Sequence, residues 1–217
     1  MIINICFHGI GTAGDEREPG EASYWIGREL FLGVLDEVRD RPDVRLSFDD
    51  GNASDIEVGL PALVERGLRA TFFPIAGRLE ESGSLSPADL RALRAAGMDI
   101  GTHGWAHIPW RRLSPQEQER EFVTAREVLA AASGGPIVDA ALPLGRYDRA
   151  MLSRLRGLDY RTVFTSDRYP TRASEWLQPR YSVTATDTVA SVRAIITRPH
   201  RVADVRARAS SAFKRRR

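Results

Sequence analysis

The sequence predicts an α/β protein built on a parallel sheet. Short apolar runs alternate with amphipathic segments along most of the 217 residues, and this alternation is typical of a parallel barrel or a doubly wound open sheet. A hydrophobic content of 42% is enough for a buried core. No repeat or low-complexity linker divides the sequence. We therefore expect one main domain over residues 1–192 and a basic helix or tail over residues 193–217.

Each expected strand is an apolar or β-branched run bounded by turn residues. In chain order the strands are expected at Ile2–Phe7, Val44–Phe48, Ala70–Ile75, Met98–Thr102, Val138–Leu142, Tyr160–Thr165 and Arg180–Val183. Amphipathic segments between them predict the helices. These are expected at Tyr24–Val38, Ser54–Arg66, Ser86–Gly97, Ser114–Ala132, Asp148–Arg156 and Thr188–Ile196.

Capping residues support several of these helix starts. Ser54 and Ser114 are each followed three residues later by glutamate, which is the capping-box pattern. Ser86 is followed by a proline at the first helical position. Ser23 is the expected N-cap of the first helix.

The composition argues against several classes of protein. Lys214 is the only lysine, whereas a P-loop needs a lysine on its phosphates and a pyridoxal enzyme needs one for its Schiff base. Gly9, Gly11 and Gly14 have the spacing of a dinucleotide-binding loop, but Asp15–Pro19 follows where that fingerprint requires a helix start. The single cysteine, Cys6, cannot form an internal disulfide.

The two ends of the sequence suggest a location. The first residues have no basic region or cleavage site of a signal peptide, and no apolar run has the length of a membrane span, so we expect a cytoplasmic protein. Residues 193–217 carry nine basic side chains and one acidic one. We expect a solvated tail that is dispensable for chemistry, with attraction to an anionic membrane surface as its alternative role. Nucleic acid is not expected, because these charges lack the interleaved aromatic residues of a stacking platform.

Polar residues follow the ends of several expected strands. Asp49-Asp50, His103, Pro143–Gly145 and His8 all lie at such ends, and in parallel barrels chemistry gathers where these ends meet. One carboxylate and the imidazoles of His103 and His107 form a usable set of ligands for a divalent metal, which leaves a second carboxylate to move protons. The four-residue spacing would place both imidazoles on one side of a helical turn.

The same set of two histidines and one carboxylate occurs in non-haem iron oxygenases. Those folds are usually all-β, unlike the alternating pattern here, so this is an alternative hypothesis.

With these features the chain resembles the polysaccharide deacetylase (NodB-homology) superfamily, carbohydrate esterase family 4. Ser47–Gly51 matches its Thr/Ser-Phe-Asp-Asp-Gly motif, and His103 with His107 matches its His-x-x-x-His motif. Ala70–Phe73 matches a common Ala-Thr-Phe-Phe segment, and Pro143-Leu144-Gly145 loosely matches a Pro-aromatic-Gly motif. The resemblance spans Ile2 to Val183 and implies a distorted (β/α)7-type barrel.

The resemblance also implies roles. Asp50, His103 and His107 would bind one divalent metal, with zinc as the first choice and cobalt, nickel or iron as alternatives. Asp49 would be the general base for the attacking water, and the backbone N–H of Leu144 would help to hold the oxyanion. The implied reaction removes an N-acetyl group from an amino sugar in a glycan, a glycolipid or a precursor.

Some family residues are missing. Ala141 stands where the family has an arginine that orients the catalytic aspartate, and Arg146 is a candidate substitute. The late Leu-x-His that supplies the general acid is absent, since the only late histidine is His200 in the basic tail. Without the orienting arginine, a non-catalytic carbohydrate-binding protein on the same scaffold is a further alternative.

The first strand offers a replacement for the general acid. Phe7-His8-Gly9-Ile10 is similar to the Tyr-His-x-Ile start of the biofilm poly-N-acetylglucosamine deacetylases, in which an N-terminal histidine takes this role. His8 is therefore the candidate general acid.

Overall fold

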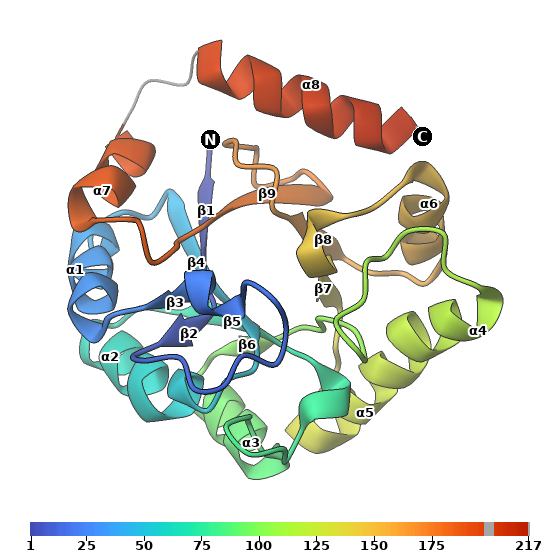
Figure 1. Ribbon diagram of the computed structural model, residues 1–217, viewed down its shortest axis with the longest axis horizontal. Coiled ribbons are helices and arrows are strands. Elements are labelled where there is room, and N and C mark those ends of the chain that lie inside the picture. Colours follow the sequence, from blue (N-terminus) through green and yellow to red (C-terminus); the bar gives the residue numbers. More distant parts are fainter. Residues whose placement is uncertain (198–201, 217) are drawn as a thin grey trace.

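Seven parallel strands form a nearly closed barrel in the computed structural model, which describes residues 1–197 and 202–216 (Figure 1). Their order around the barrel is β6-β5-β4-β1-β9-β8-β7, which confirms the predicted (β/α)7-type fold. The strands are β1 (Ile3–Phe7), β4 (Val44–Asp50), β5 (Ala70–Pro74), β6 (Asp99–Ile100), β7 (Asp139–Ala141), β8 (Thr162–Thr165) and β9 (Leu177–Ser182). His200 lies outside the described residues.

The barrel closes between β6 and β7 through a single bridge. Thr102 pairs in parallel with Ala140, its N–H donates to the Asp139 carbonyl at 3.0 Å, and its carbonyl accepts from Ala141 N–H at 2.9 Å. Gly101 makes this approach possible, because a Cβ there would lie 2.3 Å from the Phe73 ring and 2.7 Å from the Asp139 carbonyl.

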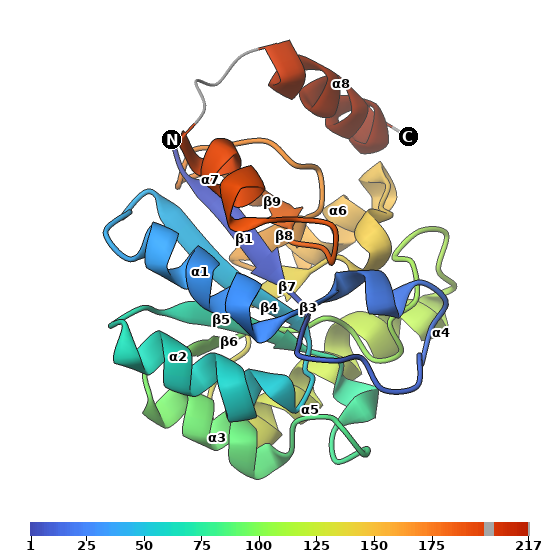
Figure 2. The same ribbon diagram turned by 60° about the vertical axis from the view of Figure 1, so that its left-hand side comes forward.

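Helices surround the barrel on its outer side (Figures 1 and 2). They are α1 (Arg28–Val38), α2 (Leu60–Glu65), α3 (Pro87–Ala95), α4 (Pro115–Gln118), α5 (Ala125–Ser133), α6 (Arg149–Gly157), α7 (Val189–Thr197) and α8 (Val202–Arg216). The structure confirms the N-cap at Ser86 and the capping box at Ser114. We find no helix among the described residues with the length and hydropathy of a membrane span.

Two predicted helix starts are wrong. The first helix begins at Arg28, not at Tyr24, because Trp25–Ile26 form strand β3, which pairs with β2 (Gly9–Ile10). Gly9 allows this pairing, since a Cβ at that position would lie 2.1 Å from the Trp25 ring. Ser54 forms no capping box, because its Oγ accepts a hydrogen bond from Ile10 N–H at 3.1 Å. A π-helical turn (Asp55–Gly59) therefore precedes α2.

The two faces of the barrel wall have different chemistry. Phe7, Phe48 and Phe72 point outward from adjacent strands into the core against the helices, and their rings contact one another. The inward face carries buried polar side chains, among them Asp49 and Arg180. Unpaired polar groups are costly inside a protein. The polar side chains inside the barrel must therefore bond to one another, as Asp49 does to Arg180.

The C-terminal helix is a packed element. The expected basic helix is present, and most of its described positions are exposed. The expectation of a frayed tail is wrong for α8, because Ser211 is fully buried and Asp204 nearly so. Sequence alone suggested a tail because basic residues dominate the segment. Several of these basic side chains bond to the barrel.

We expect Gly101→Ala to destabilise the fold by about 1–3 kcal/mol, because a methyl group there overlaps both the Phe73 ring and the Asp139 carbonyl. Gly157→Ala is the matched control, since nothing lies within 4 Å of a Cβ at that helical position. Urea unfolding of both variants is the measurement. Equal stability of the two proteins would contradict the role of Gly101 in closing the barrel.

Candidate active site

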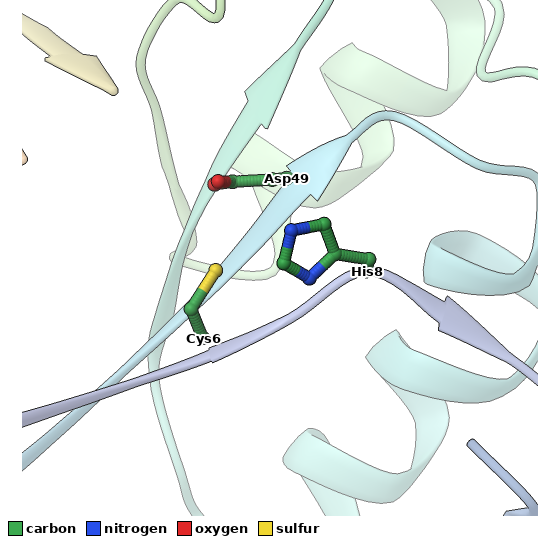
Figure 3. A group of neighbouring side chains, drawn as sticks. All are labelled: Cys6, His8 and Asp49. Carbon is green, nitrogen blue, oxygen red and sulfur yellow. The ribbon is translucent and has the colours of Figure 1, made fainter. Parts of the chain in front are cut away.

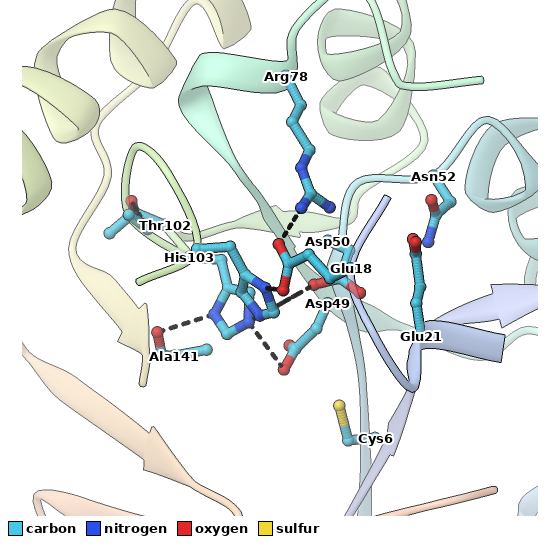
Figure 4. Close-up of polar contacts among 12 residues, drawn as sticks. Cys6, Glu18, Glu21, Asp49, Asp50, Asn52, Arg78, Thr102, His103 and Ala141 are labelled. Carbon is cyan, nitrogen blue, oxygen red and sulfur yellow. Dashed lines mark hydrogen bonds and ion pairs between the residues drawn. The ribbon is translucent and has the colours of Figure 1, made fainter. Parts of the chain in front are cut away.

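Two adjacent aspartates end strand β4 and face the same site (Figure 4). In a regular strand, neighbouring side chains point to opposite faces. Here Asp50 adopts a left-handed conformation with φ of 72°, which aspartate tolerates better than most residues. As a result both carboxylates approach one imidazole, with Asp49 Oδ2 and Asp50 Oδ1 each 3.7 Å from His103 Nε2.

Asp49 forms a buried ion pair with Arg180, which projects from β9. Arg180 Nη1 and Nη2 each donate to one carboxylate oxygen at 2.6 Å, and Nη1 also donates to Ser47 Oγ at 3.1 Å. Burial alone would raise the pKa of Asp49, but the charge and hydrogen bonds of Arg180, together with the nearby His103, outweigh burial and hold this pKa well below its usual range. Asp49 is therefore ionised at neutral pH and fixed in orientation.

Arg180 therefore fills the place expected for an orienting arginine. The sequence-based suggestion of Arg146 is wrong, because Arg146 is exposed at the rim of the cleft and it is Arg180 that pairs with Asp49. A non-catalytic protein was an alternative because the orienting arginine is absent from its usual position. The ion pair between Arg180 and Asp49 removes that reason.

The two histidines lie in an irregular loop after β6, not on the helical turn that their spacing suggested. The buried carboxylate of Glu121 holds this loop, accepting hydrogen bonds from the backbone N–H groups of Trp105 and Ala106 at 2.9 and 3.1 Å. Gly104 leaves room for that carboxylate, since a Cβ there would lie 2.3 Å from Glu121 Oε2.

Each histidine is oriented by its Nδ1 atom. His103 Nδ1 bonds to the Ala141 carbonyl at 2.9 Å, and His107 Nδ1 bonds to Glu18 at 2.6 Å. Both partners only accept, so Nδ1 carries the proton and Nε2 presents a lone pair. Arg78 pairs with Glu18 in turn. This hydrogen bonding is typical of histidines that bind a metal through Nε2.

The site fits a divalent metal. Asp50 Oδ1 is buried with no hydrogen-bond partner among the described residues, and it lies 3.7 Å from His103 Nε2 and 3.6 Å from His107 Nε2. These three atoms lie within 4.8 Å of one another. Burial lowers the pKa of His103 to about 4 against the opposing pull of Asp49, so its imidazole is neutral, as a metal ligand must be.

Cys6, His8 and Asp49 form a neighbouring group with atoms within 4.8 Å of one another (Figure 3). Arg180 already occupies both oxygens of Asp49, so we assign the metal to the Asp50 group instead. The rings of His8 and Tyr24 are in tilted contact with their centres 4.6 Å apart, and His8 Nδ1 is buried with no partner in the described part of the chain. The His8 imidazole therefore lies beside the Asp49 carboxylate, where it could contact a substrate group that reacts there.

A cleft of about 370 Å³ opens above these residues. Its lining includes both aspartates, all three histidines of the site, Leu144 and Tyr24. Leu144 is 52% exposed and has a φ of 55°, a left-handed conformation that is rare for leucine. All sequence-predicted site residues therefore border one cleft.

We expect Arg180→Met to destabilise the protein by about 3–5 kcal/mol, because it leaves the buried Asp49 carboxylate unpaired. The pair lowers the pKa of Asp49 below its ordinary value of 3.8, so its stabilisation is complete above that pH and is lost as the pH falls further. Denaturant unfolding at several pH values measures both effects. Arg146→Met is the control and should leave stability unchanged; a similar loss there would refute this assignment.

Comparison with known proteins identifies the family. The polysaccharide deacetylase family model matches residues 36–163. YxkH of Bacillus subtilis, named as a polysaccharide deacetylase, is 23% identical over 124 residues, which are 57% of this chain and 44% of YxkH. The Streptococcus pyogenes deacetylase PplD has a similar fold (TM-score 0.76, 19% identity, 91% of this chain and 98% of PplD), as has IcaB of Ammonifex degensii (0.76, 20%, 91% and 97%). The chain belongs to the polysaccharide deacetylase family.

Proposed function

We propose that this protein is a metal-dependent hydrolase that removes the N-acetyl group from an amino sugar in a glycan, a glycolipid or a precursor. One observation carries the proposal: two adjacent carboxylates have opposite surroundings. Asp49 is ionised and held in an ion pair by Arg180, whereas Asp50 directs toward two Nε2 atoms an oxygen that has no hydrogen-bond partner among the described residues. The first suits a general base, and the second suits a metal ligand.

The family supports the same reaction. PplD, which has a similar fold, was solved in complex with acetate, the product that hydrolysis of an acetamide would release. The fold does not support the alternative of a non-haem iron oxygenase, because the barrel is α/β and those enzymes are usually all-β. The family match to deacetylases does not support it either.

A divalent metal held by Asp50, His103 and His107 would polarise the acetamide carbonyl and lower the pKa of water at the site. Asp49 accepts the proton of the attacking water, since it is ionised and fixed by two hydrogen bonds from Arg180. Its own position within 3.7 Å of His103 Nε2 keeps it beside the ligand set. Zinc remains our first choice of metal, with cobalt, nickel or iron as alternatives.

Departure of the amine needs a proton, because an amide anion is a very poor leaving group. His8 is the proposed donor: its ring nitrogen lies within 4.8 Å of the Asp49 carboxylate, and it borders the cleft. The backbone N–H of Leu144, at the cleft edge, is the proposed donor to the oxyanion. Tyr24, which is 39% exposed and lines the cleft beside His8, is the proposed aromatic contact for the sugar.

We expect one tightly bound divalent metal per chain, because two imidazole nitrogens converge on a buried Asp50 oxygen that has no hydrogen-bond partner among the described residues. Elemental analysis should find the metal in the purified protein and its loss in His103→Ala and His107→Ala. His8→Ala is the control and should keep the metal. Undiminished metal in both histidine variants would falsify the ligand set.

We expect Asp49→Asn and His8→Ala to abolish different proton transfers while each retains the metal. Each should slow hydrolysis of an N-acetylated oligosaccharide about 10²–10⁴-fold. A general acid must be protonated, so loss of His8 should also remove the alkaline limb of the pH–rate profile. Wild-type turnover in Asp49→Asn would reduce Asp49 to a structural residue, and an intact alkaline limb in His8→Ala would exclude His8 as the acid.

A further inference from the structure

Helix α8 fills a gap in the ring of helices. The other long crossovers between neighbouring strands contain a helix, but β8 and β9 are joined by residues 166–176, which contain none. In both views α8 lies across this region, between α7 and α6 (Figures 1 and 2). Arg208 donates to the Pro170 carbonyl at 2.8 Å, which ties the helix to the loop. The chain therefore returns at its C-terminal end to cover the β8–β9 connection.

Ser211 lies at the centre of this contact. It is fully buried, and its Oγ is 3.1 Å from the hydroxyl groups of both Tyr147 and Tyr169. Arg215 donates to the Tyr169 hydroxyl at 2.6 Å. A small polar residue is needed here, because two buried phenols converge on one point and each requires a hydrogen-bond partner.

Lys214 connects the helix to the segment beside the cleft. Its Nζ donates to Asp167 Oδ1 at 2.7 Å and to the Gly145 carbonyl at 3.1 Å. The other oxygen of Asp167 accepts from the Tyr147 hydroxyl at 2.6 Å and from Thr165 Oγ1 at 2.9 Å. Lys214 thus pairs with a buried carboxylate and fixes two points of the 143–147 segment, one directly and one through Asp167.

Leu144 directly precedes Gly145, the first of these two fixed points. Its left-handed backbone is strained for a residue with a Cβ, so the surrounding structure has to hold it. The hydrogen bonds within its own turn are long, at 3.3 Å from Gly145 N–H to the Leu142 carbonyl and from Arg146 N–H to the Pro143 carbonyl. The segment therefore depends on partners outside it.

We propose that Lys214 is a positioning residue that holds the 143–147 segment, and with it the Leu144 N–H, in the geometry needed at the cleft. The inference rests on the proposed deacetylation for its catalytic consequence, because only an oxyanion donor there makes small displacements costly. It gives the basic C-terminal helix a role in chemistry, contrary to the expectation of a dispensable tail.

The first test compares Lys214→Met with Arg206→Met, which removes a charge from an exposed position on the same helix. We expect Lys214→Met to lower kcat about 10–100-fold with little change in KM or metal content. Arg206→Met should behave like wild type, and Lys214→Arg should recover part of the rate. Unchanged kcat in Lys214→Met, or an equal fall in Arg206→Met, would overturn the proposal.

Hydrogen exchange provides a readout that needs no turnover. Amides of residues 144–147 should exchange faster in Lys214→Met than in wild type or Arg206→Met. Unchanged exchange would overturn the inference whatever the activity. If the wild-type protein hydrolyses no acetylated sugar, the proposed function fails, and the exchange data alone then decide whether Lys214 holds the segment.

Two further measurements test the inference: a double variant controls for unfolding, and a lysine signal reports on the hydrogen bonds of Lys214. Lys214→Met combined with Asp167→Asn leaves no unpaired buried charge, and it should fold while showing the same fall in kcat. Because Lys214 is the only lysine, protein labelled with ¹⁵N-lysine gives one side-chain ammonium signal. Slow proton exchange at that signal supports the bonds to Asp167 and Gly145, and exchange as fast as in free lysine would refute them.

Discussion

The arrangement of the site depends on one buried ion pair, that of Asp49 and Arg180. Both side chains are almost fully enclosed by the barrel, where an unpaired charge would cost several kcal/mol. The bidentate geometry satisfies both oxygens of Asp49, whereas one buried oxygen of the neighbouring Asp50 has no hydrogen-bond partner in the described part of the chain. Two chemically identical residues thereby acquire different properties from their surroundings, and the proposed division into base and metal ligand follows from the pairing.

Around this pair, charged side chains hold the irregular segments that regular secondary structure does not reach. Glu18 orients His107, Glu121 bonds to the backbone of the histidine loop, and Lys214 contacts the segment that carries Leu144. Each charge comes from a distant part of the chain and bonds to donors or acceptors that the strands leave unsatisfied. The strands of the barrel place the candidate site residues, and these charged side chains fix the loops that carry them.

The candidate site residues were predictable from the sequence, whereas most of the residues that hold them in place were not. Asp49, Asp50 and His103 follow strand ends, and that pattern is local in the sequence. Arg180 is one of many basic residues, and only the pairing of β9 with β1, itself paired with β4, brings it to Asp49. Glu18 lies in a loop without a pattern. Ser54 showed a capping-box pattern but bonds to Ile10, a contact that depends on the tertiary fold.

Ala141 and Arg180 show how the orienting arginine could arise on a different strand. Both project into the barrel, Ala141 from β7 and Arg180 from β9, with Phe73 and Phe164 beside them. The Arg180 guanidinium lies 5.4 and 5.7 Å from the centres of these two rings. A long side chain at position 141 would compete for this space, which alanine leaves open. In a narrow barrel an arginine can reach the same carboxylate from more than one strand, so what the site requires is two donors on Asp49, not a fixed sequence position.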